Sequence, residues 1–303
     1  MNIGLIGLGK MGHAIAHRLI NGGHHVVGFD ANPTAQEEAK KLGATTAHSI
    51  PELAQQVRII WLMIPAGKLV DDVLKTLLPH LKPNDIIIDG GNSLFLDSIR
   101  RHELLRAKNI NFLDCGTSGG LLGEKIGFSL MVGGDKEIFE KMNDIFRAIA
   151  APDGFAYMGP SGAGHYVKMV HNGIEYALLQ SYAEGFHLLR EGHYKELDLE
   201  KITNVWNHGA VIRSWILDLA HNVFEHDQKL IDISGEIGEN LTGRWTSDEA
   251  KKHNIPVDLI ERALAIRALS RQTGGNYGTK VVALLRNQFG GHDVKKINSK
   301  KNK

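Results

Sequence analysis

The sequence begins Met-Asn-Ile-Gly-Leu-Ile-Gly-Leu-Gly-Lys-Met-Gly (1–12), and this stretch decides the fold of the first half of the chain. Residues 1–8 form a short apolar run that is typical of a buried parallel strand. Glycines then follow in the spacing Gly-x-Gly-x-x-Gly, and residues 14–20 have the pattern of a helix. A second strand is predicted from His25 to Asp30. Strand, glycine turn, helix and strand in this order predict the dinucleotide-binding unit of a doubly wound α/β sheet.

The glycine turn is the predicted site for the pyrophosphate of a dinucleotide, because the helix that follows offers free amides and the positive end of its dipole. Asp30 closes the second strand, where a carboxylate accepts hydrogen bonds from the ribose hydroxyls of NAD and repels the 2′-phosphate of NADP. No arginine follows at Ala31 or Asn32, so we predict NAD as the cofactor. The residues expected to contact it are Gly7, Leu8, Gly9, Lys10, Met11, Gly12, Asp30, Met63, Ile64 and Asn92.

Strands and helices continue to alternate up to residue 150. The predicted strands are 58–64, 85–89, 111–115 and 128–133, and the predicted helices are 67–78, 96–108 and 136–150. This alternation predicts a parallel sheet with right-handed crossovers, whose ligands bind beyond the carboxyl ends of the strands. Asn92 and the segment Ser118-Gly119-Gly120 both lie just past such ends. The amides and hydroxyl of 118–120 suit a carboxylate, and an ordinary glycine turn is an equal alternative without further context.

The second half of the chain lacks strand patterns of any length. Glycine and proline at 151–154 and 159–162 mark a boundary, which predicts a Rossmann-type domain over 1–161 and an all-α domain over 162–303. Helices in the second domain are predicted at 162–189, 197–207, 210–221, 256–270 and 277–289. The basic run 295–303 is predicted to be a disordered tail.

Composition excludes several classes of function. The chain has 35 Lys plus Arg and 34 Asp plus Glu, and a net charge of +1 gives no electrostatic basis for binding nucleic acid or an anionic membrane. No apolar run approaches the roughly 18 residues of a membrane span. The one cysteine, Cys115, fits a reducing compartment, and the 16 histidines show no metal-ligand spacing. We therefore expect a cytoplasmic protein with a small-molecule substrate and without a metal.

The helix predicted from Gly162 carries a polar stripe on an otherwise apolar surface. At 100° per residue, four polar side chains fall within roughly a hundred degrees of one another: Lys168, His171, Asn172 and Glu175. Burying such a stripe without partners would cost several kcal/mol, so it must face water, a partner or a ligand. A lysine and a glutamate two turns apart can supply a base and an acid to one substrate. An internal salt bridge with a capping amide is the structural alternative.

Six segments carry a resemblance to a known family. They are Gly-Leu-Gly-Lys-Met-Gly (7–12), Ile-Asp-Gly-Gly-Asn-Ser (88–93), Gly-Thr-Ser-Gly-Gly (116–120), His-Tyr-Val-Lys-Met-Val-His-Asn-Gly-Ile-Glu-Tyr (165–176), Thr-Gly-Arg-Trp-Thr (242–246) and Arg-Asn-Gln-Phe-Gly-Gly-His (286–292). Together they closely resemble the decarboxylating 6-phosphogluconate dehydrogenases. The length is similar to that of the shorter, bacterial-type members, which are generally NAD-linked.

The resemblance implies oxidative decarboxylation of 6-phospho-D-gluconate to D-ribulose 5-phosphate and CO2, with reduction of NAD. It implies that Lys168 is the general base at the carbon-3 hydroxyl and that Glu175 is the acid that protonates the enediol at carbon 1. The implied substrate ligands are Asn92, Ser118, Gly119, Gly120, His171, Asn172, Tyr176, Arg267, Arg286 and His292.

The same resemblance assigns the substrate phosphate and the assembly. Tyr176 and Arg267 match phosphate ligands of the family, and Arg286 and His292 match a pair that a second subunit contributes. It therefore implies a homodimer or homotetramer whose active sites are completed by the neighbouring subunit, with the helical domain binding substrate and forming the oligomer. Two residues depart from the pattern of longer members, which carry lysines at the positions of Asn240 and Pro65.

Two other functions remain open from the sequence. A 3-hydroxyisobutyrate-type dehydrogenase would share the glycine turn, the Ser-Gly-Gly loop and a Lys-x-x-x-Asn helix. It would lack the pairing of His171 with Glu175 and the Arg286/His292 segment, and its substrates carry no phosphate. The second alternative is a non-catalytic nicotinamide-binding protein, in which the acid, the base and the phosphate ligands would be idle.

Overall fold

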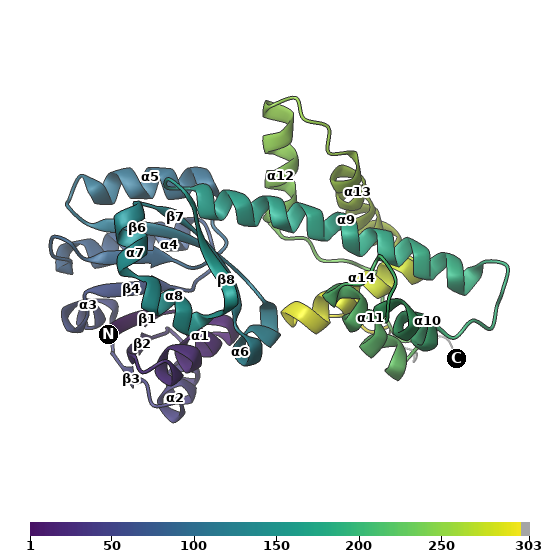
Figure 1. The fold of residues 1–303 in the computed structure, drawn as a ribbon, viewed down its shortest axis with the longest axis horizontal. Coiled ribbons are helices and arrows are strands. Elements are labelled where there is room, and N and C mark those ends of the chain that lie inside the picture. Colours follow the sequence, from purple (N-terminus) through teal and green to yellow (C-terminus); the bar gives the residue numbers. More distant parts are fainter. Residues whose placement is uncertain (298–303) are drawn as a thin grey trace. The chain divides into compact units, whose positions relative to one another are not determined.

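The computed structural model describes residues 1–297, which form two compact units (Figure 1). The first unit is Met1–Met169 and the second begins at Val170. The division falls inside the long helix α9 (Ala163–Glu191), a few residues past the boundary expected from the sequence. Within the described residues, none of the helices is long and apolar enough to cross a membrane.

A twisted sheet forms the centre of the first unit, with the strand order β3-β2-β1-β4-β5-β6-β7-β8. The strands are β1 (Asn2–Ile6), β2 (His25–Phe29), β3 (Thr45–Thr46), β4 (Ile59–Leu62), β5 (Ile86–Asp89), β6 (Asn111–Ser118), β7 (Phe128–Gly134) and β8 (Ala150–Gly159). Neighbours are parallel except for β6 and β7, which are antiparallel. The Rossmann-type α/β class predicted from the glycine turn is confirmed.

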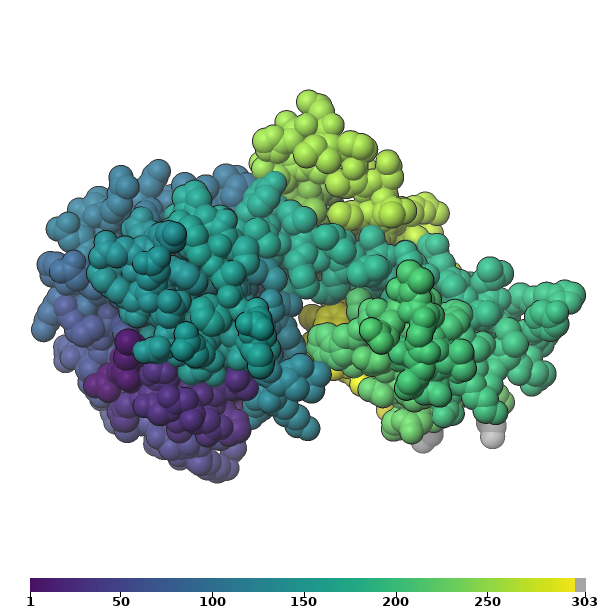
Figure 2. Space-filling model, viewed as in Figure 1, coloured from purple at the N-terminus to yellow at the C-terminus, as the bar shows by residue number. Residues whose placement is uncertain are grey.

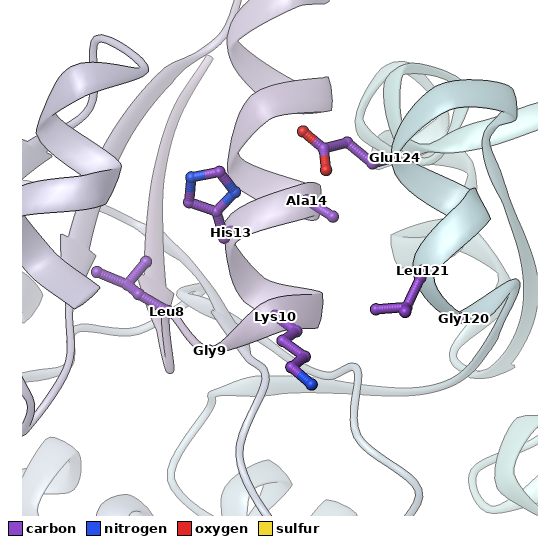
Figure 3. Close-up of a pocket in the computed structure, with 8 residues that line it drawn as sticks. All are labelled: Leu8, Gly9, Lys10, His13, Ala14, Gly120, Leu121 and Glu124. Carbon is purple, nitrogen blue, oxygen red and sulfur yellow. The ribbon is translucent and has the colours of Figure 1, made fainter. Parts of the chain in front are cut away.

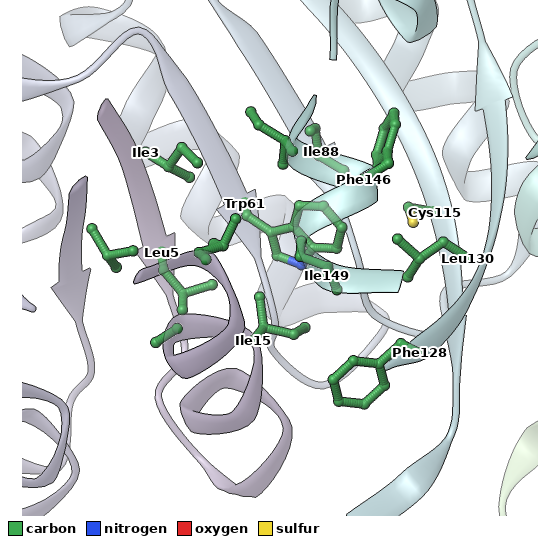
Figure 4. Close-up of a cluster of buried hydrophobic side chains, with 14 of the residues drawn as sticks. Ile3, Leu5, Ile15, Trp61, Ile88, Cys115, Phe128, Leu130, Phe146 and Ile149 are labelled. Carbon is green, nitrogen blue, oxygen red and sulfur yellow. The ribbon is translucent and has the colours of Figure 1, made fainter. Parts of the chain in front are cut away.

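Helices cover both faces of this sheet. They are α1 (Lys10–Asn21), α2 (Pro33–Lys41), α3 (Ile50–Gln56), α4 (Lys68–Leu77), α5 (Phe95–Arg106), α6 (Gly123–Ile126), α7 (Lys136–Lys141) and α8 (Asn143–Ile149), with short 3-10 turns η1 (Leu78–His80) and η2 (Gly120–Leu122). One core joins α1 and α8 to the sheet, where Trp61 packs edge-on against Phe146 (Figure 4). The opposite core joins α3, α4 and α5 to the same strands. Alternating residues of each strand point into one core or the other, as expected for a sheet that is buried on both faces.

Two features of the sheet differ from the prediction. The connection from β6 to β7 contains only the short η2 and α6, and a parallel crossover needs a dozen or more residues, so β7 runs antiparallel. Residues 150–159 form strand β8 instead of the expected turn. Because β8 lies at the edge of the sheet, where a ladder donor can be missing, it tolerates Pro152. The predicted helix 136–150 is divided into α7 and α8.

The second unit is helical, as predicted. Its helices after α9 are α10 (Leu199–Asn207), α11 (Trp215–His226), α12 (Leu241–Lys252), α13 (Asp258–Thr273) and α14 (Tyr277–Gly290). An apolar core forms between α9, α10, α11 and α14 around Phe186 and Phe224, whose ring centroids are 4.8 Å apart. Helix α12 was not predicted, and α11 begins later than the expected residue 210.

The C-terminal segment was predicted to be disordered from residue 295. Residues 295–297 instead pair with residues 232–234, where Ile233 and Lys296 form an antiparallel bridge. The remainder of that prediction, 298–303, lies outside the described residues.

Candidate active site

The glycine turn between β1 and α1 has the shape that a pyrophosphate requires. A Cβ added at Gly12 would lie 1.9 Å from the carbonyl oxygen of Gly7, so only glycine allows α1 to begin this close to the strand. At Gly9, which precedes the helix, a Cβ would meet no atom within 4 Å, so the space in front of the turn is open. The first-turn amides of any helix lack intrahelical acceptors, and here no side chain caps them from Gly9. The turn thus fits a dinucleotide phosphate.

A cavity of about 370 Å³ lies beside this turn. It is lined by Leu8, Gly9, Lys10, His13, Ala14, Gly120, Leu121 and Glu124. Figure 3 shows Leu121 and Glu124 on the side of the cavity opposite α1. His17 of α1 and Glu124 of α6 are joined across 2.9 Å, which holds α6 beside α1. The cofactor turn and the Gly120 segment therefore share one cavity.

Asp30 lies at the end of β2, as predicted. One carboxylate oxygen accepts from the amide of Leu8 at 2.7 Å, and the other accepts from the amide of Asn32 at 2.8 Å. These bonds fix the carboxylate next to the glycine turn. Each oxygen retains a lone pair, so the group can still accept from a ribose hydroxyl.

Met63, Ile64 and Asn92 follow the ends of β4 and β5 in the same unit. A Cβ at Gly7 would meet the carbonyl oxygen of Met63 at 2.3 Å and the side chain of Ile64 at 2.8 Å, so both residues border the glycine turn. Asn92 is exposed in the loop Gly90–Ser93, between two buried residues. All three lie at the carboxyl ends of strands, where ligands of such sheets bind.

The first turn of α9 is anchored on strand β6. The buried carboxylate of Asp114 accepts from the amides of Gly162 at 2.7 Å and His165 at 2.9 Å, and so satisfies two free amides of the helix N-terminus. A Cβ at Gly116 would lie 2.3 Å from the Cβ of Lys168, so this glycine permits the close crossing of helix and strand. Lys168 is only 6% exposed. The predicted base is therefore held against the strand that ends at Ser118.

Ser118, Gly119 and Gly120 follow as the end of β6 and the start of η2. Gly119 and Gly120 have φ of +134° and +53°, conformations that L side chains rarely adopt. All three are partly exposed. Gly120 lines the cavity beside the cofactor turn, and the assignment of this segment to a carboxylate stays a prediction.

The rest of the polar stripe of α9 belongs to the second unit. Asn172 is buried and donates to the hydroxyl of Thr242 at 3.2 Å, and the ring of His171 is 3.0 Å from the amide oxygen of Asn172. His171 and Glu175 are half-buried. The stripe is thus continuous along one helix, and its members differ in exposure.

A second group of residues in this unit surrounds the guanidinium of Arg267. Its central carbon lies 3.3 Å from the ring centroid of Tyr176, and the Tyr176 hydroxyl donates to the side chain of Asn240. Arg267 is 1% exposed, and within the described residues both of its terminal nitrogens lack hydrogen-bond partners. Burial, together with the nearby charge of Arg286, lowers its pKa to about 10. A buried, unpaired guanidinium is costly, and an anion would relieve that cost.

Arg286 and His292 lie at the end of α14 and just beyond it. Arg286 is buried, and this burial lowers the pKa of its guanidinium. The carbonyl of His292 accepts from the Asn287 amide at 2.8 Å, and its ring packs against Phe289. Arg286 is close enough to Arg267 in the same chain for its charge to lower the pKa of Arg267. His292 packs on the end of its own helix.

Sequence reasoning missed two residues that shape the site, Asp114 and His165. The signal for Asp114 was a carboxylate inside an apolar strand, which is stable there only with hydrogen-bond donors. His165 is one turn before Lys168, so the helical spacing that selected the stripe could have included it.

Comparison with known proteins gives one consistent result. Residues 2–169 match the family model of the NAD binding domain of 6-phosphogluconate dehydrogenase. Residues 164–288 match that of the 6-phosphogluconate dehydrogenase C-terminal domain. A relative from Haloferax volcanii, named 6-phosphogluconate dehydrogenase, NAD(+)-dependent, decarboxylating, is 46% identical over 97% of this chain and 98% of its own length.

Solved structures show the same similarity. A 6-phosphogluconate dehydrogenase from Plasmodium falciparum is 30% identical with a TM-score of 0.83, and the match covers 90% of this chain and 62% of that one. The 3-hydroxyisobutyrate dehydrogenase of Mycobacterium tuberculosis has a TM-score of 0.74 over 94% of this chain and 99% of that one. It is 23% identical, so the likeness extends to the fold alone.

Proposed function

The chain belongs to the 6-phosphogluconate dehydrogenase family, and from this premise we propose that it oxidises and decarboxylates 6-phosphogluconate with NAD. The products are ribulose 5-phosphate, CO2 and NADH. NAD is favoured by the carboxylate of Asp30 at the end of β2 and by the name of the Haloferax relative. The resemblance found in the sequence motifs is confirmed at the level of the family.

Arg267 is the observation that most directly supports a phosphorylated substrate. Its guanidinium is buried over the ring of Tyr176, and in the part of the chain that the structure describes its terminal nitrogens have no acceptors. A phosphate would supply two acceptors to this planar fork. A 3-hydroxyisobutyrate-type substrate has one carboxylate, which residues 118–120 are proposed to hold, and no phosphate, so it would leave the guanidinium unpaired.

Asn240 replaces the lysine of longer family members, and its contacts suggest how the site functions without that cation. Its side chain accepts from the hydroxyls of Tyr176 and Thr242. The ring of Tyr176 lies against Arg267. We propose that both hydroxyls turn from Asn240 to donate to the phosphate when it binds, and that Arg267 and Arg286 supply its counter-charge.

Lys168 is proposed as the base of the oxidation. NAD, when bound, supplies the nicotinamide carbon that accepts the hydride from carbon 3. Lys168 takes the proton of the carbon-3 hydroxyl, and as an ammonium it then donates a hydrogen bond to the new carbonyl oxygen. That bond stabilises the charge that develops on the oxygen as CO2 leaves, an effect worth about 3 kcal/mol in comparable sites. The close contact of α9 with β6 fixes the backbone position from which the Lys168 side chain extends.

Glu175 is proposed as the acid of the last step. It lies two turns after Lys168 on the same face of α9. After CO2 has left, Glu175 gives a proton to carbon 1 of the enediol, which forms the ketose. His171 and Asn172, between them, are proposed to hold the substrate hydroxyls. Ser118, Gly119 and Gly120 are proposed to hold its carboxylate.

We also propose a cytoplasmic homo-oligomer. Figure 2 shows helices of the second unit at the molecular surface. The exposed apolar side chains of this unit include Ile174, Leu178, Val211, Ile212 and Trp215. Burying them against another copy would stabilise the assembly. The resemblance assigned Arg286 to a neighbouring subunit, but Arg286 already lies near Arg267 in one chain. We therefore propose that Arg267 and Arg286 of one chain act on the same phosphate. That a neighbouring subunit contributes His292 to the site stays a prediction.

The test is an assay of the purified protein with 6-phosphogluconate and each nicotinamide cofactor, in which reduced cofactor and released CO2 are read together. We expect one CO2 for each NADH and a higher kcat/KM with NAD than with NADP. Gluconate, which lacks the phosphate, and 3-hydroxyisobutyrate are the control substrates. Faster turnover of 3-hydroxyisobutyrate, or NADH without CO2, would contradict the proposal.

A further inference from the structure

We propose that His165 is a positioning residue that fixes Asn92 of the cofactor-side loop relative to Lys168 of helix α9. The proposal rests on the roles given above to Asn92 and Lys168. His165 is 1% exposed and lies one helical turn before Lys168. Both of its ring nitrogens have partners in the protein, and these contacts determine what it does.

Both nitrogens of the His165 ring are used. Nε2 is 3.1 Å from the carbonyl oxygen of Gly91, and Nδ1 is 2.7 Å from the hydroxyl oxygen of Ser98 on α5. A carbonyl can only accept, so Nε2 carries the hydrogen. In the neutral ring Nδ1 then accepts from the Ser98 hydroxyl. The two bonds fix the orientation of the ring between α9, α5 and the loop Gly90–Ser93.

The loop is held at several consecutive backbone groups. The hydroxyl of Thr117 donates to the carbonyl of Gly90 at 2.9 Å, and the carboxylate of Asp89 accepts from the amide of Gly91 at 3.2 Å. These bonds come from β6 and from the loop's own strand, β5. His165 supplies the bond from α9, and the next residue after its acceptor is Asn92. The side chain of His165 therefore links the helix of the base directly to the loop of the cofactor ligand.

The other end of this link is also fixed. The backbone amide of His165 donates to the buried carboxylate of Asp114, which anchors the first turn of α9 on β6. Lys168 follows three residues later, against Gly116 of the same strand. Hydride transfer depends steeply on the relative placement of base, substrate and cofactor, and a displacement of about 1 Å can cost about a hundredfold in rate. Loss of the Gly91 bond should therefore affect turnover more than binding.

Two substitutions separate the two bonds of the ring. The amide nitrogen of a glutamine reaches the position of Nε2, so His165→Gln can keep the bond to Gly91. The amide of an asparagine reaches only the position of Nδ1, where its oxygen can accept from the hydroxyl, so His165→Asn keeps the contact with Ser98 and loses Gly91. We expect kcat of His165→Gln within about threefold of the parent. For His165→Asn we expect kcat to fall about 10- to 100-fold, with each KM within about threefold.

The isotope effect on turnover distinguishes positioning from a structural role. With 6-phosphogluconate deuterated at carbon 3, a misplaced hydride donor makes hydride transfer rate-limiting, so the isotope effect on kcat should rise in His165→Asn and stay near the parent value in His165→Gln. Equal kcat and equal isotope effects in the two variants, at equal melting temperatures, would overturn the proposal. Ser98→Ala, which removes the other bond of the ring and leaves the Gly91 bond in place, should lower kcat less than His165→Asn does.

A third variant keeps the test decisive if the asparagine protein does not fold. Thr117→Val removes the neighbouring bond to Gly90 from a different element, and it should show the same fall in kcat and rise in isotope effect. Unchanged values there would overturn the proposal. Lys168→Met separates this inference from the proposed function. If that variant is inactive while His165→Asn is normal, only the positioning role is lost; if Lys168→Met is normal, the role of the base itself is lost.

Discussion

Arg267 is the residue on which substrate choice is expected to depend most. Burial lowers its pKa to about 10, which still leaves the guanidinium charged near neutral pH. The free protein thus holds a buried cation that is stacked on Tyr176 and whose two terminal nitrogens have no acceptor among the described residues. Such a site is destabilised until an anion enters, so phosphate binding can draw on relief of that cost.

Arg267→Lys tests this reading, because a lysine cannot form the planar fork or stack on the tyrosine in the same way. We expect KM for 6-phosphogluconate to rise about 10- to 100-fold, while the weak activity on gluconate changes little. Arg262→Lys, on an exposed face of the same helix, is the matched control. An equal rise for both substrates would mean that Arg267 supports the fold and does not read the phosphate.

The proposed role of Glu175 as the acid is tested by how deuterium from the solvent is incorporated at carbon 1 of the product. In deuterium oxide the parent enzyme should place one deuterium at carbon 1 of ribulose 5-phosphate with a single configuration, because a fixed acid delivers it to one face. Glu175→Gln should slow ketose formation by about 10²- to 10⁴-fold and give mixed configurations, since the released enediol is protonated by solvent. Proton NMR of the product reads both. Glu184→Gln, exposed on the same helix, is the control, and a stereospecific product from Glu175→Gln would assign the proton to another group.

At the scale of the element, the end of β2 is expected to set cofactor choice. Asp30→Ser with Ala31→Arg removes the carboxylate that repels a 2′-phosphate and adds a cation that attracts it. We expect the ratio of kcat/KM for NADP to that for NAD to rise about tenfold or more. Ala31→Arg alone keeps the bonds from Leu8 and Asn32 to the carboxylate and should move the ratio less. If the double substitution leaves the ratio where it was, the ribose is recognised elsewhere.

The elements could be predicted where local pattern and tertiary role agree. The glycine turn, α1 and β2 have their own sequence signals, and α9 has a long run without proline. Strand β8 could not be found in this way, because Pro152, Asp153 and Gly154 favour a turn and only pairing with β7 makes the segment extended. Helix α12 was missed because its apolar residues do not form a clear stripe along one face. The glycine in its first turn packs against Tyr176, a contact that no local signal contains.

The site residues likewise divide into those with a local sequence signal and those whose roles depend on distant contacts. Lys168, Asn172 and Glu175 could be grouped from helical spacing, because one helix determines their common face. Local pattern could have marked Asp114 and His165 as candidates, but it could not give their roles, since their partners are 48 and 74 residues away in sequence. The unpaired state of Arg267 is likewise a property of the packed helices, and the sequence supplied only its identity.

At the scale of the whole molecule, the open point is which chain supplies Arg286. The proximity of Arg286 to Arg267 in one chain leads us to expect that both act on the same phosphate in cis. Subunits carrying Lys168→Met are mixed, by co-expression, with subunits carrying Arg286→Ala, and activity is read at low substrate concentration. Under the cis arrangement no activity above the sum of the two variants is expected.

Recovery in that mixture would contradict the cis arrangement. If a neighbour supplies Arg286, half of the sites in each mixed dimer combine an intact lysine with an intact arginine. Activity would then return to about a quarter of the parent value, since about half of the dimers are mixed. The parent melting temperature in each variant is the control for folding.

The proposed oxidation depends on the amine of Lys168, which takes the proton of the carbon-3 hydroxyl as NAD is reduced. The most direct measurement is the turnover of Lys168→Met with saturating 6-phosphogluconate and NAD, with Lys141→Met, an exposed lysine, as the control. We predict that kcat falls by about 10²- to 10⁴-fold in the first variant and stays at the parent value in the second, at unchanged melting temperatures. Near-parent turnover of Lys168→Met would contradict the account.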